Sequence, residues 1–272
     1  MKTKIIAEIG INHNGSLKIA KKLIDAAIIS GCDYVKFQKR NPDICVPDQQ
    51  KMKHKVTPWG KMTYINYKHK IEFSKKQFDE IDKYCSKRGM KWFASVWDVD
   101  SVDFMAEYVD ITKIPSAHLT NYKLLNYARE KNNLMMLSTG MSREEDIEKS
   151  IKIGNPDVIF HTNSTYPCPV EELNLNYINS LKSKYPNKAI GYSGHEYGLV
   201  TTFAAVALGV EYVERHVTLD RTLWGSDQIA SIEPAGVMKL VKGIRDIEKA
   251  FGDPGPRKIL GGELEKLKSL RG

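Results

Sequence analysis

The feature that most constrains the fold of this chain is a regular alternation between short runs of β-branched and aromatic residues and longer stretches with helical periodicity. Such alternation is typical of β-α-β units. The predicted strands are Lys4–Ile11, Tyr34–Arg40, Lys91–Trp97, Val109–Ser116, Leu134–Gly140, Asp157–Ser164, Ala189–His195 and Glu211–Thr218. The predicted helices are Leu17–Ser30, Ser74–Lys87, Val102–Ala106, Tyr122–Lys131, Glu144–Lys152, Glu171–Lys184, Leu199–Ala207 and Ala235–Phe251.

Eight strand-helix pairs in 272 residues predict a closed (β/α)8 TIM barrel, because that fold typically takes about 250 residues. An open, doubly wound sheet is the competing architecture. It is disfavoured because neither a GxGxxG fingerprint nor a GxxxxGK[ST] loop follows a predicted strand. We therefore predict one domain over residues 1–272, with a long insertion at 41–73. Long loops of this kind are commonly functional lids.

Composition excludes several other classes of protein. With 42% hydrophobic and 27% charged residues, the chain is typical of a globular protein. No apolar run reaches roughly 18 residues and Glu8 interrupts the apolar N-terminus, so we expect a cytoplasmic protein without a membrane span or signal peptide. Four scattered cysteines favour reduced thiols. The net charge of +8 is spread along the chain without an aromatic-interleaved basic motif, so we expect no nucleic-acid partner.

Polar residues gather at the carboxyl ends of the predicted strands, where a barrel of this kind keeps its active site. Side chains alternate between the two faces of a strand, so residues two apart share a face. Four strands then carry polar sets that we expect to face the barrel mouth: Glu8, Gly10 and Asn12; Tyr34, Lys36 and Gln38; Gly191, Ser193 and His195; and Tyr212, Glu214 and His216.

Two histidines in these sets, His195 and His216, end the last two strands, which are neighbours in a closed barrel. Buried histidine and glutamate are costly unless they are paired or bind a metal. Two imidazoles with Glu214 nearby make a plausible open site for a divalent transition metal. The other five histidines are interpreted as ordinary core or surface residues.

A second group of residues indicates an anion site at the strand ends. Helix N-termini and backbone amides at such positions favour phosphate. A single serine after a strand is most often a helix cap, but two lysines together with four serines favour the phosphate interpretation. The group consists of Lys36, Lys113, Ser116, Ser138, Ser164 and Ser193. From the residues alone we predict a metal-assisted enzyme that acts on a small phosphorylated acid.

Seven segments resemble, in order, the motifs of the sialic acid synthase family: IIAEIGINHNGSL, YVKFQ, KIPSAHLTN, LSTGM, HTNSTYPCP, GYSGHEYG and ALGVEYVERHVTLDR. The likeness covers nearly every predicted strand end from Lys4 to about Asp227. It implies a C–C bond-forming transferase of carbohydrate biosynthesis with a (β/α)8 barrel. Such an enzyme condenses phosphoenolpyruvate with an N-acylated hexosamine aldehyde and releases phosphate, with Mn2+ or Mg2+ bound.

The resemblance also implies roles for particular residues. His195 and His216 would hold the metal, and the lysines and serines of the anion group would surround phosphoenolpyruvate. Gln38 and Tyr166 would line the junction of the two substrates, and Asp227 would bind sugar hydroxyls. Glu8 and Glu214 would manage protons and water. The lysines, Lys36 and Lys113, would stabilise charge electrostatically.

Three departures from the family pattern bear on the sugar aldehyde. Pro115-Ser116-Ala117-His118 stands where the family has glycine-serine-glycine-glutamate. Ser193-Gly194-His195 stands where it has serine-aspartate-histidine, which removes a carboxylate beside the metal ligand. The sequence ends at Gly272, so we expect no antifreeze-protein-like C-terminal domain, which in the family supplies an arginine to the partner subunit's site. Recognition of an N-acyl group would then come from the insertion at 41–73, from a homo-oligomer or from a separate partner protein. Alternatively it does not occur, and the acceptor is a different sugar aldehyde.

Two alternatives stay open. One is a synthase or aldolase on the same barrel that takes a phosphorylated sugar, which would need a second basic cluster on the sugar side. Candidates for that cluster are Arg215, Arg221 and Lys39–Arg40, although each is equally well interpreted as a surface residue. The other alternative is a non-catalytic sugar-binding barrel, which the retained histidines, lysines and glutamates argue against.

Overall fold

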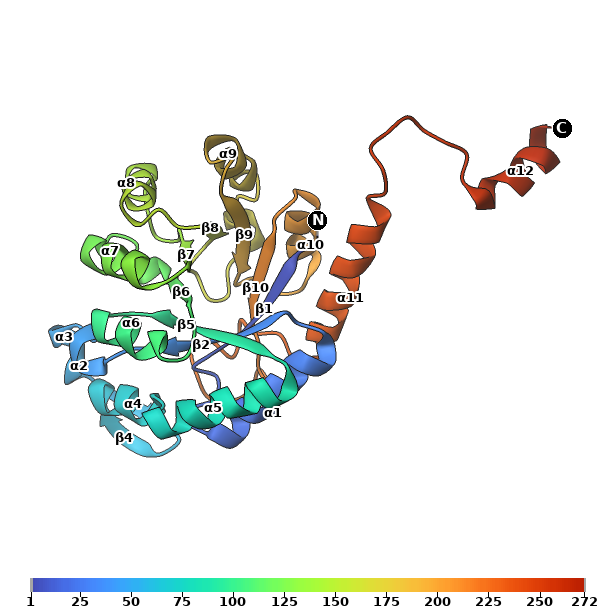
Figure 1. Ribbon diagram of the computed structural model, residues 1–272. Helices are drawn as coiled ribbons and strands as arrows, with labels where there is room; N and C mark the ends of the chain where they lie inside the picture. Colours follow the sequence, from blue (N-terminus) through green and yellow to red (C-terminus); the bar gives the residue numbers. More distant parts are fainter. Residues whose placement is uncertain (1, 272) are drawn as a thin grey trace.

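The computed structural model describes residues 2–271 and contains a closed barrel of parallel strands in the order β1-β10-β9-β8-β7-β6-β5-β2 (Figure 1). This confirms the predicted (β/α)8 fold. The barrel strands are β1 (Lys4–Gly10), β2 (Tyr34–Lys39), β5 (Lys91–Val96), β6 (Ile111–Ile114), β7 (Leu134–Ser138), β8 (Val158–Thr162), β9 (Ala189–Gly194) and β10 (Tyr212–His216). Each lies within its predicted run, because alternating apolar residues mark a strand strongly.

Helices surround the barrel and follow the strands along the chain (Figure 1). They are α1 (Leu17–Ser30), α5 (Lys75–Arg88), α6 (Val99–Ala106), α7 (Tyr122–Lys131), α8 (Glu144–Gly154), α9 (Tyr177–Lys184), α10 (Val200–Ala207) and α11 (Pro234–Ala250). Local chemistry sets their ends: the Ser16 hydroxyl accepts a hydrogen bond from the Ile19 amide at the start of α1, and Gly31 ends it with φ of +83°. Helix α9 begins later than predicted, after Asn174, whose φ is also positive.

Two apolar layers hold the barrel together. Outward strand residues such as Val35, Phe37 and Val213 pack against the helices and are fully buried. Inside, a second cluster fills the end of the barrel opposite the carboxyl ends of the strands, and we call it the apolar floor: Ile6, Tyr34, Phe93, Met136, Val158 and Phe160. Each large apolar side chain that is buried contributes roughly 1.5–3 kcal/mol to folding. The floor leaves space for polar groups only towards the carboxyl ends.

The insertion at 41–73, predicted as one long loop, folds into small elements of its own. They are α2 (Pro42–Cys45), α3 (Asp48–Lys51), the antiparallel pair β3 (His54–Thr57) and β4 (Gly60–Thr63), and α4 (Tyr64–Ile71). Tyr67 of α4 is buried, and its ring lies edge-on to Trp224, with centroids 5.2 Å apart. The insertion is therefore attached to the loop that follows β10, and its action as a lid stays a prediction.

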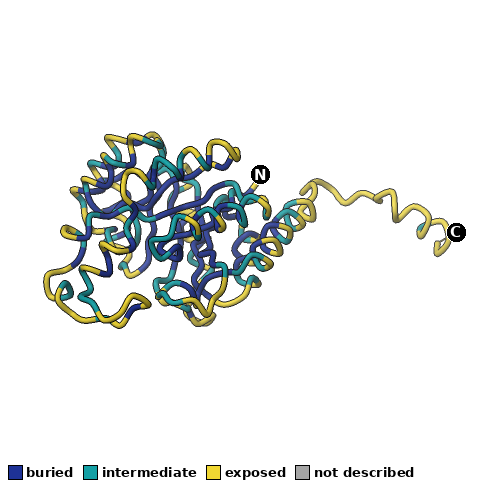
Figure 2. The backbone as a smooth tube through the Cα atoms, turned by 90° about the horizontal axis from the view of Figure 1, so that it is seen from below, coloured by how far each residue is buried: buried dark blue, intermediate teal, exposed yellow. Residues whose placement is uncertain are grey.

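Beyond α11 the chain leaves the barrel as an extended arm that ends in α12 (Gly261–Arg271), a helix that sequence analysis missed (Figure 1). Figure 2 shows the arm exposed along its length, and none of the side chains of α12 is buried. Among residues 2–271 no helix combines the length and apolar character that a membrane crossing requires. The four cysteines are free thiols, as predicted.

Candidate active site

A cavity of about 280 Å³ lies at the carboxyl ends of the barrel strands. It is lined by twelve of the thirteen predicted site residues: Glu8, Lys36, Gln38, Lys113, Ser116, Ser138, Ser164, Tyr166, Ser193, His195, Glu214 and His216. The thirteenth, Asp227, does not line the cavity but places a carboxylate oxygen 3.9 Å from Nδ1 of His216. The structure thus brings the predicted residues together, while their roles stay predictions.

Four charged side chains form the bottom of this cavity, and we call them the inner network: Glu8, Lys36, Lys113 and Glu214. Lys36 Nζ lies 2.8 Å from Glu8 Oε2 and 3.5 Å from Glu214 Oε1. Lys113 Nζ lies 2.8 Å from Glu214 Oε2. All four are buried. Sequence analysis placed both lysines in an anion site at the strand ends, but their side chains start from positions within β2 and β6, which places them deep inside the barrel.

The inner network separates the protonation behaviour of its two carboxyl groups. Burial raises the pKa of Glu8, although Lys36 opposes the shift. Burial acts on Glu214 as well, but Lys113 and Lys36 outweigh it and lower its pKa to about 2. Burial also lowers the pKa of Lys113 to about 8, against the attraction of Glu214. Glu8 is thus the carboxyl group whose surroundings favour a proton, and Glu214 is the anion.

One wall of the cavity presents hydroxyl groups from successive strand ends. The Ser116 hydroxyl accepts a hydrogen bond of 3.0 Å from the Gly140 amide. A β-carbon on Gly140 would lie 2.3 Å from Ser164 Oγ and 2.9 Å from Ser116 Oγ, so only glycine lets these hydroxyls approach each other. We call Ser116, Ser138 and Ser164 the serine wall. Ser193 differs, since its hydroxyl donates to Glu214 Oε1 at 3.3 Å and therefore belongs beside the inner network.

The two histidines meet at the ends of β9 and β10, with ring centroids 5.4 Å apart. His195 Nδ1 lies 2.6 Å from the carbonyl oxygen of Asn163, so this nitrogen carries the proton and Nε2 keeps its lone pair. Burial lowers the pKa of His195 to about 3, which keeps the ring neutral. His216 Nδ1 is buried without a hydrogen-bond partner. Both rings therefore fit a metal.

The remaining coordination positions of a metal held by these two imidazoles would have to be filled by substrate or water. Within residues 2–271 no group of three or more histidine, cysteine, aspartate or glutamate side chains is arranged to hold a metal ion. Glu214, which sequence analysis placed near the metal, is occupied by the two lysines. Open coordination positions are typical of a catalytic rather than a structural metal.

Two further predicted residues lie between the inner network and the mouth. The Gln38 side-chain amide donates to Glu8 Oε1 at 3.3 Å. The Tyr166 ring lies over His195, with centroids 4.0 Å apart, and remains partly exposed. Sequence analysis missed other lining residues, namely Ser95, Trp97, Pro115, Ala117, Met141 and Thr162. Ser95 accepts a hydrogen bond of 2.7 Å from Lys36. It is a polar residue near the carboxyl end of β5, which is the position where site residues were expected, so its place in the strand could have identified it.

Several sequence expectations fail at the mouth. Asn12 does not share the cavity with Glu8, because the register of β1 shifts between Glu8 and Gly10 and Gly10 has a positive φ. Its amide instead donates to the Val217 carbonyl and to Ser231. Of the residues proposed for a second basic cluster, Arg215 is buried against Glu196.

The other members of that cluster are also engaged elsewhere. Lys39 lies over the ring of Phe104 at 4.6 Å, on the outer side of the barrel. Arg221 is near Glu233 and exposed. Arg40 is buried in an ion pair with Glu72, and its guanidinium lies 5.2 Å from the ring of Trp97, a residue of the cavity wall.

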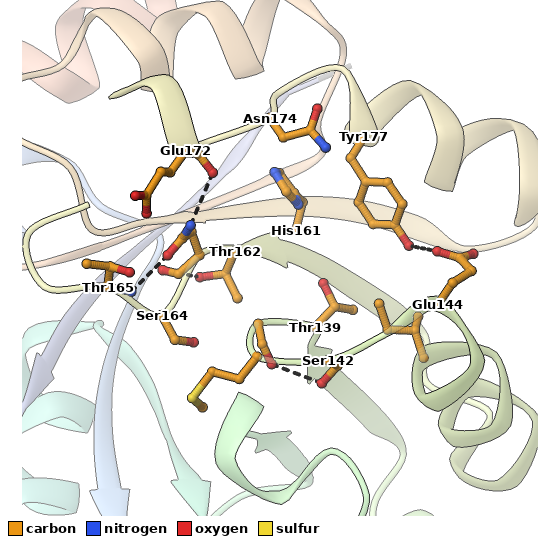
Figure 3. Close-up of a pocket in the computed structure, with 14 residues that line it drawn as sticks. Thr139, Ser142, Glu144, His161, Thr162, Ser164, Thr165, Glu172, Asn174 and Tyr177 are labelled. Carbon is orange, nitrogen blue, oxygen red and sulfur yellow. Dashed lines mark hydrogen bonds between the residues drawn. The ribbon is translucent and has the colours of Figure 1, made fainter. Parts of the chain in front are cut away.

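Figure 3 shows a second cavity, of about 440 Å³, which Ser164 of the serine wall also lines. The two share Met141, Thr162 and Ser164 as lining residues. In Figure 3 the side chains of Thr139, Ser142, Asn174 and Tyr177 surround this space, and Tyr177 donates to Glu144 at its edge. His161 lines it too but is held by the Leu173 carbonyl, consistent with its interpretation as an ordinary histidine.

Comparison with known proteins agrees with this geometry. A model of the NeuB family matches residues 23–255. N-acetylneuraminate-9-phosphate synthase from Homo sapiens is 38% identical over 92% of this chain and 71% of its own length. N,N'-diacetyllegionaminic acid synthase from Campylobacter jejuni is 36% identical over 99% of this chain and 83% of its own.

A solved structure is similar throughout. The crystal structure of N-acetylneuraminic acid (sialic acid) synthetase from Leptospira borgpetersenii superposes with a TM-score of 0.86 at 33% identity, covering 100% of this chain and 93% of that one. The family match spans most of the barrel, and twelve of the thirteen predicted residues line one cavity. The chain belongs to the NeuB family.

Proposed function

We propose that this protein condenses phosphoenolpyruvate with the open-chain form of a sugar aldehyde to give a nonulosonic or related ulosonic acid, with release of phosphate. The observation that carries the proposal is the cavity itself. It gathers two buried lysines, a wall of serine hydroxyls and two adjacent imidazoles. Membership in a family of nonulosonate synthases supports the reaction class, and the sugar is left open.

The cavity offers each part of phosphoenolpyruvate a matching group. Lys36 and Lys113 supply positive charge at the bottom, where a carboxylate would be bound in a water-poor environment. The hydroxyls of Ser116 and Ser164 provide uncharged donors for phosphate oxygens, and the Gly140 amide orients the first of them by donating to its oxygen. Because these donors are in place before the substrate arrives, they stabilise developing charge without reorganisation.

The bond-forming step joins C3 of the enol to the aldehyde carbon, and the aldehyde oxygen takes a proton. Water then adds at C2, and the C–O bond to phosphate breaks, so that phosphate carries away the electron pair. Glu8 would hold the proton that the aldehyde oxygen takes, since burial raises the pKa of its carboxyl group. Glu214 stays ionised between the lysines and keeps both of them charged and oriented.

His195 and His216 are the residues that would hold Mn2+ or Mg2+. A divalent ion there would act as a Lewis acid towards the aldehyde oxygen. Tyr166, which lies over His195, and Asp227, beside His216, would contact the sugar. With Trp97 and Arg40 they make the acceptor side of the mouth, which the folded insertion borders through Glu72.

The deciding experiment incubates the purified protein with Mn2+, phosphoenolpyruvate and a panel of hexosamines, hexoses and pentoses, and measures free phosphate. We expect release only when one of the aldoses is present. Phosphate release without an aldose would indicate a phosphatase instead. No release across the whole panel would refute the synthase proposal. A phosphorylated hexosamine in the same panel tests the alternative of a phosphorylated acceptor.

A further inference from the structure

A second buried ion pair lies on the opposite side of strands β9 and β10 from the cavity. Glu196 and Arg215 are 0% and 2% exposed, and Arg215 Nη1 lies 2.9 Å from Glu196 Oε1. We call this pair the outer clamp. It is hydrogen-bonded to the side chains of Tyr192, Thr201 and Thr202 and to the backbone carbonyl of Gly198. Its charges are thus tied to β9, to β10 and to the start of α10.

The clamp is joined directly to both histidines. Glu196 follows His195 in the chain, and Arg215 precedes His216. Because side chains alternate along a strand, Arg215 points outward while His216 points into the barrel. The Arg215 guanidinium also donates to the backbone carbonyl of Glu196 at 2.5 Å. The two strand ends that carry the imidazoles are therefore linked from behind by side-chain and main-chain contacts.

Gly194 makes room for the clamp. It lies opposite Arg215 in the register of β9 and β10. A β-carbon at this position would lie 2.5 Å from Glu196 Oε2 and 2.8 Å from the ring of Tyr192. Glycine at this position is thus required by the Glu196 carboxylate. The structure does contain a carboxylate next to His195, but that carboxylate points away from the cavity and towards Arg215.

A buried ion pair is weak evidence for stability, since apolar residues of similar volume often serve as well. Charge pairs do fix geometry, because a hydrogen-bonded guanidinium holds its partners in a narrow range of positions. We propose that Glu196 and Arg215 are positioning residues that set the separation and orientation of His195 and His216. The inference rests on the proposed function, in which the two imidazoles act together.

The test is the double variant Glu196→Gln/Arg215→Met, which removes both charges and leaves neither uncompensated. We expect a folded protein whose affinity for Mn2+, measured by isothermal titration calorimetry, falls about 10- to 100-fold, as for other residues that orient metal ligands. The kcat should fall at least tenfold. The KM for phosphoenolpyruvate should stay within about twofold, since the inner network and the serine wall are untouched.

The matched control is Arg245→Met, which removes a partly buried arginine paired with Asp33 and Glu248 at the other end of the barrel. It should lower thermal stability without changing Mn2+ affinity or kcat. A folded double variant with native Mn2+ affinity and native kcat would overturn the positioning role. If the double variant does not fold, Thr202→Val decides, because it removes a hydroxyl that bonds both clamp residues. That variant should bind Mn2+ at least about threefold more weakly, and native affinity would overturn the proposal.

Failure of the proposed function is distinguishable from failure of this inference. An unmodified protein that releases no phosphate with any aldose refutes the synthase proposal. An active unmodified protein whose double variant is equally active, with the same Mn2+ affinity, refutes only the clamp. If the unmodified protein is active without Mn2+, the kinetics of the double variant decide whether the clamp has a positioning role. Displaced imidazoles should then lower its kcat and leave its KM for phosphoenolpyruvate unchanged.

Discussion

The inner network and the outer clamp lie on opposite faces of the same strand, and they differ in how their charges are satisfied. Glu214 meets only side chains on its own side, two lysines and a serine hydroxyl, next to an open cavity. Arg215, the next residue, is bound by a carboxylate, a hydroxyl and two backbone carbonyls. The inner charges are balanced by side chains that face the cavity, whereas the outer charges are also bound by the backbone. On β10, Glu214 therefore faces the cavity, and the next residue, Arg215, holds the neighbouring backbone.

The largest expected effect concerns the clamp. Arg215→Met alone leaves Glu196 buried and unpaired, so we expect a loss of about 3–5 kcal/mol in the free energy of unfolding. Urea titration followed by circular dichroism measures it. Lys36→Met should lower the free energy of unfolding by less, because Glu8, whose pKa is raised by burial, can take up a proton and become neutral. Equal losses in the two variants would contradict the distinction between the two networks.

The next effect concerns catalysis. In Lys113→Met the cavity loses one of its two cations, and kcat/KM for phosphoenolpyruvate should fall about 10²- to 10³-fold, as when other preorganised electrostatic groups are removed. Steady-state phosphate release gives the ratio. Lys91→Met, at the exposed start of β5, is the matched control and should have no effect. A loss below about fivefold for Lys113→Met would show that the inner network is not part of the substrate site.

A smaller effect is expected at the serine wall. Gly140→Ala pushes a methyl group into the space of Ser164 Oγ, at 2.3 Å, and displaces a hydroxyl from phosphate. Loss of one hydrogen bond to a charged group, worth about 1.5–3 kcal/mol, should raise the KM for phosphoenolpyruvate at least tenfold. Gly262→Ala, where a β-carbon meets nothing within 4 Å, is the control. An unchanged KM would place the phosphate elsewhere.

The smallest effect depends on pH. Lys113 has a pKa lowered to about 8 by burial, and it faces Glu214, Lys36, Glu8 and the ring of Phe160. Its positive charge is present below that pKa and is lost as pH rises through it. The KM for phosphoenolpyruvate should therefore rise above pH 8, approaching tenfold per pH unit. Lys113→Arg, which stays charged, should abolish this rise. The same rise in Lys113→Arg would assign the titration to another group.

Sequence analysis predicted the barrel because its signal is local. Polar residues two apart on β2, β9 and β10 face the cavity, and apolar neighbours such as Val35 and Val213 face the helices. Alternation fails where backbone geometry interrupts it. The register shift near Gly10 turns Asn12 away from the cavity, and no pattern of residues predicts that shift.

Contacts between residues far apart in the sequence were the other features that sequence analysis could not predict. Arg215 reads as a surface residue in the sequence, because its partner Glu196 is 19 positions away and neither is marked by periodicity. The insertion was predicted as a loop, since its buried side chains pack against residues far from it in sequence, such as Tyr67 against Trp224. The cavity residues Ala117 and Met141 are apolar and lie after strand ends, so nothing in their chemistry distinguishes them from ordinary loop residues.

The apolar floor has a consequence for the order of binding. Because Phe93, Phe160 and their neighbours close one end of the barrel, the inner network is reached from the mouth, past Tyr166 and the histidines. Phosphoenolpyruvate would then have to enter before the sugar, which would otherwise stand in its way. Initial-rate kinetics should show an ordered mechanism, with dead-end inhibitors of the sugar site uncompetitive against phosphoenolpyruvate. A packed hydrophobic layer can in this way determine the order in which two substrates bind, although it contacts neither of them.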